Sequence, residues 1–168
     1  GKKWIWNNTV WASLFTVFFA LTVASTIPWL WLMSIDAHWY STMYSWYTFA
    51  SSFVSGMSLI ALFIIYLKNN DKLEYVTEEH LHDIGKFMFA FSVFWTYLWF
   101  SQFMLIWYSN IPEEVVYYQQ RWEQYRGLFW ITMIVNFAFP MLVLMSRDSK
   151  RNKSFLLFIA LLIVFFHW

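Results

Sequence analysis

The residues of this chain that are suited to chemistry lie mostly at the edges of long apolar runs. Glu79, His82, Asp83 and Lys86 precede one such run. Spacings of three and four residues place Glu79 with His82 and Asp83, and His82 with Lys86, on shared helical faces. Histidine and carboxylate groups exchange protons, so the cluster predicts a mouth that collects them, with Asp83 and Lys86 deepest. The alternative is a solvated helix end with ordinary ion pairs.

Hydroxyl and amide groups continue into the same run. Ser92 and Thr96 share one helical face, and Gln102 lies beside it. Such groups can hold a chain of water molecules that relays protons, and in membranes they also hydrogen-bond neighbouring helices. Both interpretations stay open for this stretch.

Asp36 and His38 are two titratable groups within a stretch rich in Trp and Tyr, WLWLMSIDAHWYSTM, residues 29–43. Indole and phenol rings favour the membrane–water boundary. This pair can bind a polar headgroup, release protons at the outer face, or anchor the chain at the interface by simple hydrogen bonds.

Two polar positions fall in the middle of apolar runs. Pro140 frees the backbone carbonyl of Asn136, which leaves a local acceptor, although a kink without function is the favoured interpretation. His167 lies roughly 20 Å along the last apolar run and raises the same question. A haem held by two histidines needs them on facing helices at one depth. Only His38 and His167 are candidates, and this pairing is disfavoured.

The elements that position these residues are predicted from length and composition. Of 168 residues, 60% are hydrophobic and 12% charged, against roughly 25% charged in soluble domains. Apolar runs of about 20 residues match the hydrocarbon thickness of a bilayer. We therefore expect an all-α integral membrane protein, a bundle of about five transmembrane helices in one domain, residues 1–168, with spans at about 9–27, 44–67, 83–108, 128–146 and 154–168.

Local signals refine these boundaries. Thr77, followed by two glutamates, predicts an N-cap and a third helix that begins near Glu78 and projects beyond the membrane. Pro28 predicts an end or a kink in the first helix. Residues 29–43 are then expected to form an interfacial or re-entrant piece, and the polar, aromatic stretch 115–127 an interfacial helix.

Charge predicts the orientation. With five alternating spans, one side receives nine basic residues, Lys2, Lys3, Lys68, Lys72, Lys86, Arg147, Lys150, Arg151 and Lys153, and the other receives only Arg121 and Arg126. The excess of Lys and Arg in cytoplasmic loops places the first set, and the N-terminus of the segment, in the cytoplasm.

Composition also disfavours several classes of function. A net charge of +1 and dispersed basic residues give no case for nucleic acid binding. The absence of Cys excludes thiolate zinc sites, Cys-ligated iron–sulfur clusters and covalent c-type haem within these residues. No phosphate-binding loop or nucleophile motif occurs. The start at Gly1 and the stop at Trp168 inside an apolar run favour a segment of a longer protein.

Two stretches carry a family resemblance. Residues 36–56, DAHWYSTMYSWYTFASSFVSG, and 83–114, DIGKFMFAFSVFWTYLWFSQFMLIWYSNIPEE, resemble the second large, quinone-binding membrane subunit of alternative complex III, a bacterial quinol:cytochrome c oxidoreductase. That subunit is one of the polysulfide-reductase-like, or NrfD-like, membrane proteins. The resemblance covers nearly the whole segment and matches the C-terminal half of the family.

The resemblance implies a multi-pass subunit of the bacterial inner membrane, which supports quinol oxidation and proton translocation. Its partners would be membrane lipid, a related membrane subunit and subunits that carry iron–sulfur clusters and haem, with no redox cofactor in this chain and quinol as a possible ligand. The proton path would comprise Asp83, Lys86, Ser92, Thr96 and Gln102 from the inside, Asp36 and His38 at the outer end, and His167.

Two other functions remain open. The chain can be a structural membrane anchor without its own quinone site or proton path. It can also be an independent secondary transporter with broken helices and a site at the membrane midplane. The predicted break at Pro28 allows the transporter, whereas the lack of a charged pair at mid-depth disfavours it.

Overall fold

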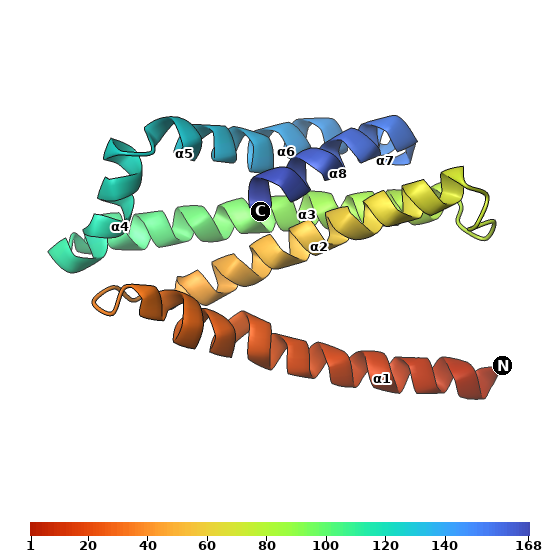
Figure 1. Ribbon diagram of the computed structural model, residues 1–168, viewed down its shortest axis with the longest axis horizontal. Coiled ribbons are helices and arrows are strands. Elements are labelled where there is room, and N and C mark those ends of the chain that lie inside the picture. The colour runs from red at the N-terminus through yellow and green to blue at the C-terminus, as the bar shows by residue number, and fades with distance from the viewer.

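The structure, a computed structural model, describes residues 1–168 and is entirely helical, as the sequence predicts (Figure 1). Eight α-helices alternate with short π- and 3-10-helical turns. In chain order they are α1 (Lys2–Leu21), η1 (Thr22–Thr26), η2 (Pro28–Leu32), η3 (Met33–Ile35), α2 (Met43–Asn69), α3 (Glu78–Ser109), α4 (Pro112–Glu123), α5 (Arg126–Met133), η4 (Ile134–Ala138), α6 (Phe139–Leu144), α7 (Arg147–Arg151) and α8 (Lys153–His167).

Four continuous helical stretches are long and apolar enough to cross a membrane. They are Lys2–Ile35, Met43–Asn69, Glu78–Ser109 and Arg126–Leu144. The fifth predicted span forms the shorter apolar helix α8, Lys153–His167. The lengths and the apolar character of these helices indicate a multi-pass membrane protein whose surface contacts lipid.

The first helix does not end at Pro28, which was one of the two outcomes expected there. The chain stays helical through Pro28 and the stretch 29–35, because the π-helical turns η1 and η2 and the 3-10 turn η3 continue α1 to Ile35. Proline has no N–H to donate, and a π turn accommodates it by shifting the hydrogen-bond pattern by one residue. Only residues 36–42 form a connector, so residues 29–43 are not a re-entrant piece.

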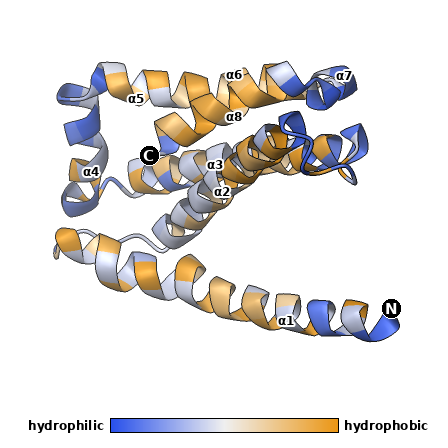
Figure 2. Ribbon diagram, turned by 45° about the vertical axis from the view of Figure 1, so that its right-hand side comes forward, coloured by the Kyte–Doolittle hydropathy of each residue, from blue (hydrophilic) through white to orange (hydrophobic).

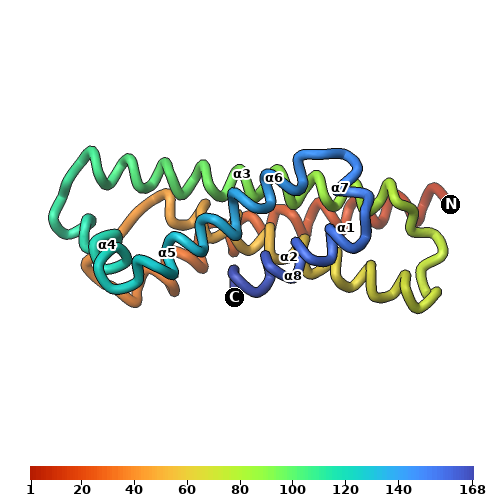
Figure 3. Tube along the Cα trace, turned by 90° about the horizontal axis from the view of Figure 1, so that it is seen from above, coloured from red at the N-terminus to blue at the C-terminus, as the bar shows by residue number.

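The packed core lies between α2, α3 and α8, with α6 closing one side. Its fully buried apolar side chains are Val54, Ala61, Leu81, Met88, Leu144, Leu156, Ile159, Ala160 and Ile163. Figure 3 shows α2 and α8 side by side along this core. By contrast, α1 has no buried residue and diverges from α2 (Figure 1). Its contacts with α2 come near its C-terminal end, for example Phe19 against Phe49 with ring centroids 5.8 Å apart.

The connectors lie at the two ends of the bundle. The N-terminus, the connector between α2 and α3, and α7 share one end, while the 36–42 connector and α4 share the other (Figure 1). Hydrophilic residues gather at these ends and apolar residues along the helices (Figure 2). The nine basic residues assigned to one side of the membrane therefore lie at one end of the molecule.

Candidate functional site

Buried side chains of α3 carry polar groups along much of its length. His82, Ser92, Trp95 and Gln102 are 8%, 1%, 2% and 1% exposed. Ser92, Trp95 and Gln102 lie within about 80° of one another around the helix, whereas His82 lies about 160° from Gln102. The twenty residues from His82 to Gln102 span about 30 Å, which is the thickness of the hydrocarbon core. Buried polar groups of α3 thus occur at depths that extend across the membrane.

One buried polar atom of each of these side chains has no hydrogen-bond partner within the chain: Nδ1 of His82, Oγ of Ser92, Nε1 of Trp95 and Nε2 of Gln102. Four such atoms come from other elements. Oδ1 of Asn136 and Nε2 of His167 lie on η4 and α8, and the other two belong to Tyr118 and Arg151. His82, Ser92, Trp95, Gln102, Asn136 and His167 are considered together. We call these six residues the buried polar row. An unsatisfied polar group in a lipid environment costs several kcal/mol, so such groups are kept where they bind water or a ligand.

The hydrogen bond of His167, a member of this row, defines its tautomer. Its Nδ1 lies 3.0 Å from the carbonyl oxygen of Ile163. A carbonyl only accepts, so Nδ1 carries the proton and the neutral ring offers its Nε2 lone pair. The ring lies against Trp95, with centroids 5.7 Å apart. It also lines a cavity of about 240 Å³ together with Ser52 and Ser55 of α2. The C-terminal turn of α8 therefore adds a proton acceptor to the row.

Asn136, another member of the row, lies in a π turn. The turn η4 places the N–H of Phe139 on the carbonyl of Ile134, five residues back, just before Pro140. Asn136 lies within this turn and is 1% exposed. Such turns are frequent at functional sites because they reorient a side chain without ending the helix. The π turn that precedes Pro140 thus carries a buried amide.

Asp83 and Lys86 are exposed on the surface of α3 rather than buried. They form an ion pair of 2.8 Å with side chains 61% and 56% exposed. Glu79 pairs with Arg151 of α7. The buried member of the predicted mouth is His82, which sequence reasoning ranked lower. Its burial follows from its register with Leu81, Gly85 and Met88, which only the structure identifies as residues that pack into the core.

Of the remaining predicted residues, Thr96 lies beside the row, and Asp36 and His38 lie outside it. Thr96 is half-buried and donates to the carbonyl oxygen of Ser92 at 3.0 Å. Asp36 and His38 are exposed in the 36–42 connector, where the backbone N–H of His38 donates to Oδ1 of Asp36 at 3.2 Å. They form a local turn with no contact to the row.

The neighbouring Trp39 fixes this connector against α4. Its indole N–H donates to the carbonyl oxygen of Glu114 at 3.2 Å. Its ring stacks on Tyr117, with centroids 4.4 Å apart and 12° between the ring planes. Trp39 is 6% exposed. The connector and α4 are therefore one packed unit at this end of the bundle.

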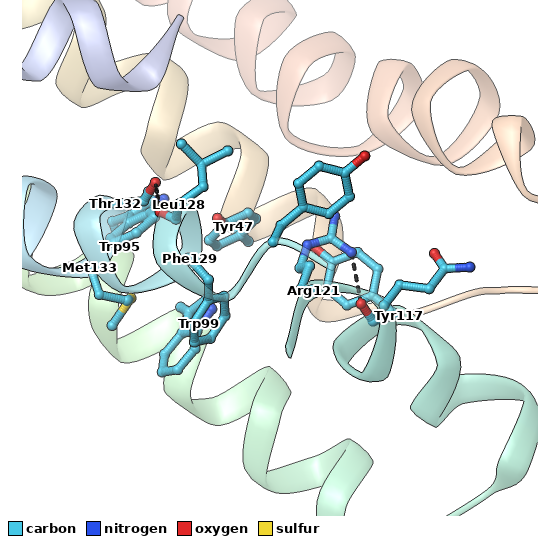
Figure 4. Close-up of a pocket in the computed structure, with 11 residues that line it drawn as sticks. Tyr47, Trp95, Trp99, Tyr117, Arg121, Leu128, Phe129, Thr132 and Met133 are labelled. Carbon is cyan, nitrogen blue, oxygen red and sulfur yellow. Dashed lines mark hydrogen bonds between the residues drawn. The ribbon is translucent and has the colours of Figure 1, made fainter. Parts of the chain in front are cut away.

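Sequence reasoning missed a cavity that opens beside the row. It measures about 440 Å³ and is lined mainly by aromatic side chains of α2, α3, α4 and α5 (Figure 4). We call it the aromatic chamber. Trp95 lines both the chamber and the row, Tyr47 lies beside it, and Arg121 supplies the one charged group. The Arg121 guanidinium lies 3.4 Å from the centre of the Tyr117 ring and donates to the Tyr117 carbonyl at 2.8 Å.

This arrangement gives the chamber both apolar walls and hydrogen-bond donors. Burial raises the pKa of the Tyr117 phenol, and the Arg121 guanidinium opposes that effect. The phenol therefore keeps its proton at physiological pH. A planar ring with polar substituents could lie between these aromatic walls.

The structure has no set of side chains placed to ligate a metal ion or a haem. No group of three or more His, Cys, Asp or Glu side chains is placed to hold a metal ion. His167 lines a cavity with Ser52, nine residues into α2 and thus about 14 Å from its start, whereas His38 precedes that helix. The two histidines therefore differ in depth and do not face each other across a haem.

Comparison with models of known protein families and with curated proteins gives no match for this sequence.

Proposed function

We propose that this chain is an integral membrane subunit of a bacterial quinol:cytochrome c oxidoreductase of the alternative complex III type, and that it moves protons while the complex oxidises quinol. The identity of the complex rests on the resemblance of residues 36–56 and 83–114. The observation that carries the proton-moving role is the buried polar row, whose α3 members extend over about 30 Å of an otherwise apolar bundle.

The proposed path runs from the cationic end to the opposite end. Asp83 and Lys86 collect protons at the surface, and His82 passes them inward. Ser92, with Thr96 beside it, and Gln102 then hold water molecules in the interior, with Asn136 and His167 lining the same route. Asp36 and His38 receive protons at the far end. Neutral histidine and water-bound hydroxyl and amide groups transfer protons without a buried charge that persists.

Quinol is the proposed small-molecule ligand, and the aromatic chamber supports it. The chamber is open and has aromatic walls, with the phenol of Tyr47 and the guanidinium of Arg121 available to hydroxyl or carbonyl oxygens. Iron–sulfur clusters and haem would belong to partner subunits, because this chain has no Cys and no metal-ligand cluster to hold them. The nine cationic residues favour the cytoplasm for the N-terminal end.

The test uses the assembled complex in proteoliposomes. Quinol-driven reduction of cytochrome c and proton release are measured together for Ser92→Ala and Asp83→Asn. Ser101→Ala is the matched control for Ser92→Ala. Both serines lie on α3, but Ser101 is less buried than Ser92 and already donates to the carbonyl of Tyr97. We expect Ser92→Ala and Asp83→Asn to lower the number of protons released per electron, and Ser101→Ala to leave it unchanged.

Each alternative function has its own outcome. If Ser92→Ala and Asp83→Asn both assemble and keep wild-type electron transfer and proton release, the path is wrong and the chain is a structural anchor. If the purified chain alone drives solute transport in liposomes, it is a secondary transporter. Purification of the tagged chain without c-type haem or iron–sulfur partners contradicts the assignment to the complex, independently of the proton path.

A further inference from the structure

A second cavity, which the proposed function does not use, lies along the outside of the bundle. It measures about 550 Å³ and is formed by the C-terminal half of α3 with α4 and α5. Its lining is apolar or aromatic except for Asn110 and Gln119. Trp99 and Phe129 line both this cavity and the aromatic chamber, so they form the wall between the two. We call this second cavity the lateral groove.

The groove follows the C-terminal half of α3. Its floor follows α3 from Trp99 to Trp107, eight residues and thus about 12 Å. Its sides are open, because Trp107 and Trp130 are 65% and 47% exposed. An apolar slot of this kind, parallel to a spanning helix, accommodates a hydrocarbon chain that lies in the bilayer.

The α4 side forms the rim of the groove and has the composition of a membrane–water boundary. Helix α4 combines aromatic and charged residues, which is typical of an interfacial helix, and Trp122 and Trp130 belong to the side chains that favour this level. The hydroxyl group of Tyr118 is buried beside the groove and has no hydrogen-bond partner. The rim thus lies where lipid headgroups and their ester linkages are found.

One cation stands at this rim without an anionic partner. Arg126 begins α5, and its guanidinium lies 5.0 Å from the centre of the Trp122 ring. It forms no ion pair, since the chain has only two, both at the other end of the bundle. Arg121, the other cation of this end, is held against Tyr117 in the aromatic chamber. Arginine recognises phosphate with two parallel hydrogen bonds.

We propose that the lateral groove is a binding site for one glycerophospholipid. One acyl chain lies along the floor between Trp99 and Trp107, the ester region meets the Tyr118 hydroxyl group, and the phosphate binds Arg126. Charge complementarity favours a phospholipid over an isoprenoid quinol, because a quinol offers no anion to this guanidinium. The site is independent of the proposed respiratory function and would exist in a structural anchor or a transporter as well.

The experiment uses the full chain in native-like membranes and a phosphatidylglycerol that carries a photoreactive diazirine on one acyl chain. Wild type is compared with Arg126→Gln, which removes the cation, and with Val115→Phe, which fills the groove that Val115 lines. Arg121→Gln is the matched control, because it removes the same charge at the same end but outside the groove. Crosslinked peptides are identified by mass spectrometry, and retained phospholipid is counted by native mass spectrometry in mild detergent.

We expect wild-type crosslinks on the peptides that contain residues 99–107 and 115–130. Arg126→Gln should lower labelling and retention about tenfold, as expected for the loss of one charge-assisted contact. Val115→Phe should lower both without any change of charge, and Arg121→Gln should leave both near the wild-type level. The proposal is overturned if Arg121→Gln and Arg126→Gln lower labelling equally, or if the lipid-facing residues of α1 label as strongly as the groove. Displacement of the probe by an added long-chain quinone, with binding of that quinone unaffected by Arg126→Gln, would also overturn it.

Discussion

Replacement of Gln102 by leucine gives the sharpest test of the buried polar row. Gln102 is 1% exposed, and its amide nitrogen has no partner in the chain. Leucine has a similar volume and no polar atom. A buried polar group without its hydrogen bond costs about 1–3 kcal/mol. If Gln102 is retained for proton transfer rather than for packing, Gln102→Leu should raise the free energy of unfolding by about that amount.

Thermal unfolding in detergent measures this change. The chain has no Cys, so thiol-reactive dyes report nothing, but its 13 Trp residues provide an intrinsic fluorescence signal. For a chain of this size, each kcal/mol corresponds to about 2–4 °C in the unfolding midpoint. The control is Gln124→Leu at the exposed end of α4, where the same substitution should leave the midpoint within about 0.5 kcal/mol of wild type.

The same variant should also slow proton release in the reconstituted complex, so stability and function change in opposite directions. A loss of about 1 kcal/mol or more would refute the reasoning, because it would mean that the amide holds the helices together. A gain in stability with unchanged proton release would refute the path through Gln102 while leaving the account of its burial intact.

Three other predictions concern the α4 end and the α3–α7 contact. Burial raises the pKa of the Tyr118 phenol, so the unfolded chain loses this proton first and stability should fall above about pH 10, by up to about 1.4 kcal/mol per pH unit. Melting curves of Tyr118→Phe at pH 9–11 should show a shallower fall, and an identical slope would contradict this. Trp39→Phe keeps a stacked ring but loses the bond to the Glu114 carbonyl, so denaturant titration in micelles should show a cost of about 1 kcal/mol, and proteolysis should increase within residues 36–42. Gly85→Ala would place a Cβ 2.8 Å from Cγ of Lys150, so the free energy of unfolding should fall by about 1–3 kcal/mol. In a double-mutant cycle, Lys150→Ala should recover part of this lost stability.

Several boundaries could be predicted because their causes are local. Thr77 is expected to begin the third helix, and its backbone N–H does bond to the ring of His80 at 3.0 Å as part of a capping box. The apolar runs form helices at the expected positions, since lipid requires every backbone polar group to be satisfied within the segment. The first helix does not end at Pro28 because a π turn can carry a helix past a proline, and no local signal distinguishes this outcome from a break.

The sequence by itself determined that the chain is helical and spans a membrane, and that its cations gather at one end. These properties depend on the length and composition of each apolar run, because each run interacts with the bilayer through its own residues. Only the tertiary structure decided that His82 rather than Asp83 or Lys86 turns inward, because apolar residues surround α3 and its pattern alone does not single out a buried face. The aromatic chamber and the lateral groove likewise arise only when α4 folds back against α3 and α5, through contacts between residues far apart in the chain.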